Sequence, residues 1–102
     1  MSNEASIKLN YVLSEDCVLS ERETECLSLV AVGYSNLHGA NVLNISKGMF
    51  KKNLKDVFDK LYVGDRSYAV VKAIRFGILT YDMVDRVLLK YNLQPRDVQR
   101  SS

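Results

Sequence analysis

Apolar and basic residues follow two separate helical faces between residues 46 and 61. The apolar positions are spaced i, i+4, i+7, i+8 and i+11, and they are Phe50, Leu54, Val57, Phe58 and Leu61. A stripe of this width on a 3.6-residue period is typical of an amphipathic helix with one buried face. Lys47, Lys51 and Lys55 are four residues apart on another face. We therefore predict a helix over 46–61, capped by Ser46, that is buried on one side and basic on the other.

Two helices are predicted before this segment. The first runs from residue 21 to about residue 32, because Ser20 and Glu23 match a capping box. The second spans 35–43, with apolar residues spaced by three, and ends at Asn44, a residue type that tolerates positive φ. A helix, a tight turn and a second helix that share one core form a helix-turn-helix unit. The second predicted helix and the basic helix are arranged in this way.

Two helices are predicted after the basic helix. The fourth spans 66–76 and ends before Gly77, and its inward-facing residues are Ala69, Val70, Ala73 and Ile74. The fifth begins after Thr80, and its apolar stripe is Tyr81, Val84, Val87, Leu88 and Tyr91. The expected fold class is all-α, with a four-helix domain followed by an additional C-terminal helix. We expect the domain at residues 19–79, preceded by a partly disordered N-terminal arm at residues 1–18. A helical extension at residues 80–92 and a flexible tail at residues 93–102 would follow it.

The charges of the chain are unevenly distributed. Residues 1–34 hold two basic and six acidic side chains, a net charge of −4, whereas residues 35–102 hold twelve basic and six acidic ones, a net charge of +6. This asymmetry gives the middle and end of the chain a positive field that would steer it to phosphates. The N-terminus lacks the features of a signal peptide, and no apolar run is long enough for a membrane span. We expect a cytoplasmic protein that does not contact a membrane.

The residue types needed for catalysis or metal binding are not gathered in this sequence. No paired carboxylates, Cys-His pair or glycine loop for phosphate is present. Cys17 and Cys26 are too few for a metal site, and Cys26 has the apolar neighbours of a buried side chain. His38 is expected at the surface, where it could face a phosphate. The sequence therefore predicts a protein that is not an enzyme and that holds no cofactor or metal.

Residues 19–79 resemble the DNA-binding domain of the LuxR/FixJ/GerE type, a four-helix helix-turn-helix module of bacterial transcription regulators. The signals that carry the resemblance occur in order and at family spacing. They are Leu19-Ser20-x-Arg22-Glu23-x-Glu25-x-Leu27, Ala31-x-Gly33-Tyr34-Ser35-Asn36, Ala40-x-x-Leu43-x-Ile45-Ser46, Lys51-x-x-Leu54-x-x-Val57-Phe58-x-Lys60-Leu61 and Val63-x-x-Arg66-x-x-Ala69-Val70.

The resemblance implies a sequence-specific transcription regulator that binds double-stranded DNA as a homodimer and associates with the nucleoid when bound. Helix 46–61 would then lie in the major groove, where lysine can read guanine and asparagine can read adenine. The DNA-binding residues expected from the resemblance and from these chemistries are Ser35, Asn36, Leu37, His38, Ser46, Lys47, Met49, Lys51, Lys52, Asn53 and Lys55. The fourth helix would pair the two subunits, through Ala69, Val70, Ala73 and Ile74.

Several residues depart from the usual pattern of that family. Leu37 and His38 replace a polar or charged pair, and Gly39 replaces a large aliphatic residue. Gly48, Met49 and Phe50 replace a polar or basic residue, a threonine and a valine. These departures leave a second hypothesis open, in which the domain is degenerate and acts as a co-regulator or antagonist that binds another transcription regulator or RNA polymerase. DNA binding is favoured because four lysines remain on the second helix of the unit.

Overall fold

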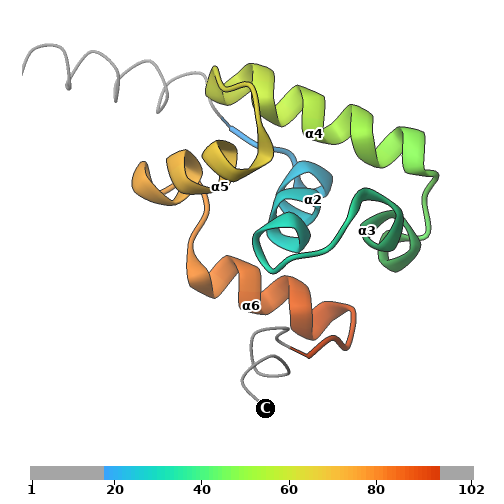
Figure 1. Cartoon of the computed structure of the whole chain (residues 1–102). Helices are drawn as coiled ribbons and strands as arrows, with labels where there is room; N and C mark the ends of the chain where they lie inside the picture. The colour runs from blue at the N-terminus through green and yellow to red at the C-terminus, as the bar shows by residue number, and fades with distance from the viewer. Residues whose placement is uncertain (1–17, 95–102) are drawn as a thin grey trace, which may run out of the picture.

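The computed structural model describes residues 18–94, which form helices joined by short turns (Figure 1). The helices are α2 Glu21–Ala31, α3 Asn36–Leu43, α4 Lys47–Leu61, α5 Arg66–Arg75 and α6 Tyr81–Lys90. This arrangement confirms the predicted all-α class and the additional C-terminal helix. The predicted disorder of the arm and of the tail concerns residues 1–17 and 95–102, which lie outside the described residues. Over residues 18–94, no helix combines the length and apolarity needed to cross a bilayer.

Each of these helices begins with a side-chain cap. In every case a side-chain oxygen accepts a hydrogen bond from the backbone N–H three residues on, which satisfies one of the free donors of the first turn. The capping residues are Ser20, Ser35, Ser46, Asp65 and Thr80. Glu23 completes the predicted capping box of α2 by accepting from the Ser20 N–H at 2.9 Å. Asn44 and Tyr62 end α3 and α4 in the left-handed conformation, with φ of 58° and 59°.

Helix α2 lies at the centre of the domain (Figure 1). It contacts the other four helices of residues 18–94, and α4 and α6 lie on its opposite sides. Cys26, Leu27 and Leu29 of α2 are each fully buried although they project in different directions. A helix with buried residues on several sides must be covered on several sides, which is what this position provides.

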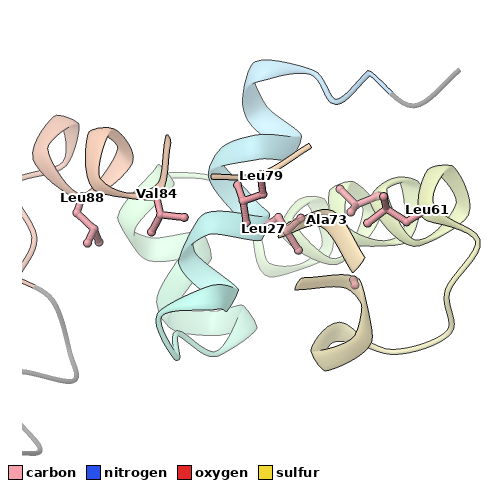
Figure 2. Packing of buried hydrophobic residues seen from close by; sticks show 8 residues of the cluster. Leu27, Leu61, Ala73, Leu79, Val84 and Leu88 are labelled. Carbon is pink, nitrogen blue, oxygen red and sulfur yellow. The ribbon is translucent and has the colours of Figure 1, made fainter. Parts of the chain in front are cut away.

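The buried side chains form two clusters on different sides of α2. The first cluster joins α2, α4, α5 and α6, and Figure 2 shows its members Leu27, Leu61, Ala73, Leu79, Val84 and Leu88. The second cluster joins α2, α3, α4 and one residue of α6, and it consists of Cys26, Leu29, Ala40, Leu43, Phe50, Leu54 and Val87. The helix-turn-helix unit therefore rests on the second cluster, while α5 packs on the first.

Helix α6 belongs to the core of the domain. Val84 and Leu88 enter the first cluster and Val87 enters the second. Tyr81, which the sequence pattern assigns to the buried stripe, is instead exposed at the start of the helix. Leu93, which falls in the predicted flexible tail, is half-buried against both clusters. The ordered packing therefore continues slightly beyond the predicted end of the helical extension.

A buried carboxylate fixes α6 against α2. Glu25 accepts hydrogen bonds from the Nζ atom of Lys90 at 2.6 Å and from the hydroxyl of Tyr91 at 2.9 Å. The bond to Glu25 is the main cause that raises the pKa of Lys90. Burial, followed by the bond to Glu25, raises the pKa of Tyr91. The buried carboxylate of Glu25 is tolerated because Lys90 and Tyr91, at the end of α6, supply hydrogen-bond donors to it.

Candidate nucleic-acid interface

The turn between α3 and α4 is short and fully specified by its residues. Asn44 takes the left-handed conformation, the Ile45 N–H donates to the Ala40 carbonyl at 3.0 Å, and the Ser46 hydroxyl accepts from the Met49 N–H at 3.0 Å. Ile45 is half-buried against the second cluster, which fixes the direction in which α4 leaves the turn. This local geometry matches the helix-turn-helix unit that the sequence predicts.

Gly39 and Phe50 occupy one packing site between α3 and α4. A Cβ atom placed on Gly39 would lie 2.5 Å from ring atoms Cε2 and Cζ of Phe50, which is far inside van der Waals contact. Phe50 is fully buried and fills the space beside the glycine backbone. The aliphatic side chain missing at residue 39 is therefore replaced by the larger side chain at residue 50. These two departures from the family pattern compensate each other in the core.

Four of the five lysines of α4 lie on its exposed surface. Lys52 and Lys55 form ion pairs with Asp56 and Asp59, with Nζ to Oδ2 distances of 3.2 and 3.3 Å. Their side chains remain 67% and 75% exposed, and exposed pairs of this kind contribute only about 0.3–0.5 kcal/mol. Two other lysines, at positions 47 and 51, are exposed and form no ion pair within residues 18–94. A cationic surface therefore remains on α4.

The other predicted contact residues differ in their exposure and in the hydrogen bonds that they already form within the protein. His38 and Met49 are exposed at the first turns of α3 and α4. Asn53 donates one N–H of Nδ2 to the Met49 carbonyl at 2.9 Å, so its amide oxygen and its second N–H are left to contact another molecule. Asn36 accepts through Oδ1 a hydrogen bond from the guanidinium of Arg66. Sequence reasoning missed this last bond, because the two residues lie on different helices.

Lys60 has a structural role that separates it from the other lysines of α4. Its Nζ atom contacts Oε1 of Glu23 at 2.7 Å and the Val18 carbonyl at 3.0 Å. Glu23 is buried and also caps α2, so this bond ties the end of α4 to the start of α2. The position of Lys60 in the last turn of α4 also complements the dipole of its own helix.

The residues predicted for dimerisation lie mostly inside the domain. Ala69 and Ala73 are fully buried in the first cluster. Val70 and Ile74 are half-buried and pack against the same cluster. The outer surface of α5 instead presents Tyr68 and Val71, and Val71 is 57% exposed. The sequence pattern identifies the inward-facing residues of this helix correctly, and those residues pack in the domain's own core.

Comparison with known proteins identifies this arrangement of helices. The family model for bacterial regulatory proteins of the luxR family matches residues 17–73, more than half of the chain. The transcriptional regulatory protein LnrK of Bacillus subtilis is 33% identical over 63 residues, which cover 62% of this chain and 29% of LnrK. The transcriptional regulatory protein DegU of Brevibacillus brevis is 38% identical over 60 residues, covering 59% of this chain and 25% of DegU.

A further relative is the response regulator protein VraR of Staphylococcus aureus, 37% identical over 62 residues that cover 61% of this chain and 30% of VraR. The chain thus matches between 25% and 30% of the length of these three relatives. No solved structure shows significant similarity to the chain. The matched segment contains α2, α3, α4 and most of α5, including the whole helix-turn-helix unit. The protein is a member of the luxR family of bacterial regulatory proteins.

Proposed function

We propose that this protein is a sequence-specific, DNA-binding transcription regulator that acts in the bacterial cytoplasm and places α4 in the major groove. The observation that carries the proposal is the division of α4 into two surfaces. Phe50, Leu54 and Val57 are buried in the domain, whereas the lysines project from the exposed side. A major groove about 12 Å wide accepts one helix held in this way.

The exposed side chains of α4 supply two kinds of contact. Lysines neutralise phosphates and release counterions, which provides affinity at any sequence. A lysine that reaches a base edge can bind guanine, and the exposed Met49 can contact a thymine methyl group. Specificity then depends on which of these side chains reach the bases.

The double variant Lys51→Ala with Lys55→Ala tests this proposal. We expect weaker binding to all duplexes and a shallower dependence of log Kd on log salt, by about 0.9 for each phosphate that is no longer neutralised. Fluorescence anisotropy across a salt series measures both. The matched control is Arg75→Gln with Arg86→Gln, which removes two exposed charges from α5 and α6. Equal binding by the lysine variant and the wild-type protein would contradict DNA binding through α4.

We further propose a homodimer formed through the outer surface of α5. Tyr68 and Val71 are large exposed side chains three residues apart, and they are therefore neighbours on this helix. Val71→Glu should shift sedimentation toward the monomer without unfolding the domain, because residue 71 is not part of the core. Leu89→Glu on α6 is the comparison variant, because Leu89 is 80% exposed. A monomer from Leu89→Glu alone would place the interface on α6.

The alternative function is a co-regulator or antagonist that binds another transcription regulator or RNA polymerase. It is favoured by the exposure of two large apolar side chains, Leu37 and Met49, at the first turns of α3 and α4. If these helices serve DNA, Leu37→Asn with Met49→Thr should keep the salt-dependent affinity that the lysines supply and change only the preferred bases. If they serve a protein partner, the same variant should lose the partner in a pull-down while wild-type protein shows no salt-dependent DNA binding.

A further inference from the structure

A small basic pocket lies beside the exposed surface of α4. Its volume is about 170 Å³, and its lining residues are Asn36, Lys51, Leu54, Lys55, Phe58 and Arg66. The pocket is therefore shared by the first residue of α3, the middle of α4 and the first residue of α5. Two of the lining side chains are apolar, and the other four are an amide and three cations.

The cations around this pocket are not balanced by acidic groups in its lining. No carboxylate lines the pocket, and Asp59, which pairs with Lys55, is itself 65% exposed. Arg66 is half-buried and forms no ion pair with a carboxylate of residues 18–94. Removing a guanidinium partly from water without an anionic partner is unfavourable. An anion in the pocket would compensate that unfavourable desolvation.

The bond between Arg66 and Asn36 orients both side chains for such an anion. A guanidinium has only donors, so the amide of Asn36 must turn its oxygen toward Arg66. The Asn36 NH₂ group is then left as a donor, together with the remaining N–H groups of Arg66. Asn36 is also the first residue of α3, where the helix dipole favours negative charge. Every polar group of the lining can therefore donate toward one acceptor-rich ligand.

We propose that this pocket binds one phosphodiester group of the DNA backbone and that Arg66, held by Asn36, is its central contact. Arg66 thereby becomes a DNA-binding residue outside the helix-turn-helix unit. A phosphate contact from α5 fixes the angle at which α4 enters the groove, because α5 and α4 are packed together in the same core. This inference rests on the proposed DNA binding.

Asn36→Asp separates this role from a purely structural one. A carboxylate at residue 36 would pair with Arg66 and complement the dipole of α3, so the melting temperature should stay equal or rise. The same carboxylate would repel a phosphate, so the Kd for a duplex should increase about tenfold or more at low salt. A rise in stability combined with weaker DNA binding is not expected from a residue that only supports the fold.

Arg66→Gln with the control Arg75→Gln completes the test. Both variants remove one charge from α5, but only Arg66 lines the pocket. Arg66→Gln should lower the slope of log Kd against log salt by about 0.9, and Arg75→Gln should not change it. If Lys51→Ala weakens binding while Asn36→Asp and Arg66→Gln match wild type, the pocket does not hold phosphate and the proposed function stands. If wild-type protein shows no salt-dependent binding, both proposals fail together.

Discussion

The side chains of residues 39 and 50 form a pair that has to change together. Gly39→Ala alone should destabilise the domain by about 1–3 kcal/mol, because the new methyl group overlaps the Phe50 ring. Phe50→Val alone should destabilise it by about 2 kcal/mol or more, because it leaves a cavity. The double variant should be destabilised by less than the sum of the two. Urea denaturation of the four proteins gives the coupling energy directly.

Sequence reasoning identifies both residues but not their relation. Each departs from the pattern of the family that the sequence resembles. From that pattern alone, Gly39 is expected to leave a gap in the core. The two positions lie in different helices and meet only after the turn at Asn44 has folded. Nothing in their local spacing indicates contact, so the compensation becomes visible only in three dimensions.

The buried thiol of Cys26 makes stability depend on pH in the alkaline range. Burial raises the pKa of Cys26 from 9.0 to about 12, with a smaller opposing effect of Arg22. Because the folded pKa lies above the unfolded one, this stabilisation is complete below pH 9 and disappears as pH rises toward 12. The unfolding free energy should fall by up to about 1.4 kcal/mol per pH unit over this window.

Chemical denaturation at several pH values measures this slope. Cys26→Ala should lower stability at neutral pH but flatten the decrease above pH 9. Tyr91 also has a raised pKa, so Tyr91→Phe should remove a second part of the alkaline decrease. An unchanged slope in both variants would show that other groups control alkaline unfolding.

At the scale of the helix, α4 carries acidic residues that limit its own basic surface. Asp56 and Asp59 pair with Lys52 and Lys55 and add negative charge to the exposed side. Asp56→Asn with Asp59→Asn should therefore increase affinity for any duplex severalfold at low salt, since it frees the lysines and removes repulsion of phosphates.

The matched control for this change is on α6. Asp82→Asn with Asp85→Asn raises the net charge by the same amount, at exposed positions of another helix. Anisotropy titrations of both double variants separate an effect of α4 from an effect of total charge. Equal gains in the two proteins would mean that only the overall field matters.

Helix limits are well predicted from sequence because caps are local, whereas the burial of individual polar side chains is predicted less well. The serine and threonine caps follow from neighbouring residues alone. In α5, however, Val71 is exposed and Lys72 is buried, with its Nζ atom 5.9 Å from the centre of the Tyr68 ring. The inward-facing set of α5 follows from its period, whereas the burial of Lys72 depends on packing that this period does not encode.

For the molecule as a whole, α6 stabilises the domain although it follows the segment that defines the family. Leu88 is buried in the first cluster, and Leu89 beside it is 80% exposed. Leu88→Ala should lower the free energy of unfolding by about 2–5 kcal/mol. Leu89→Ala should change it by less than about 0.5 kcal/mol, because folding removes little of its side chain from solvent.

Denaturation followed by circular dichroism compares the two leucine variants. A single cooperative transition is expected in both, since α6 shares its clusters with α2 and α4. Equal stabilities, or a separate early transition for α6, would indicate an appendage and not a part of the core.

The candidate site is predictable from sequence in outline and not in detail. The spacing of the lysines and the cap at Ser46 locate the exposed helix correctly. The contact between Arg66 and Asn36 joins residues that are 30 positions apart in the chain, so no local pattern could reveal it. The apolar period of α5, in contrast, does identify Ala73 as an inward-facing residue, and the structure buries it.

The fit of Phe50 beside Gly39 limits how helix α4 can be exchanged. A substituted second helix that carries valine at position 50 would leave an unfilled space against the bare α3 backbone. Such a chimera needs the donor's residue 39 as well. Helices α3 and α4 of this protein should therefore be exchanged as a pair, and not as single helices.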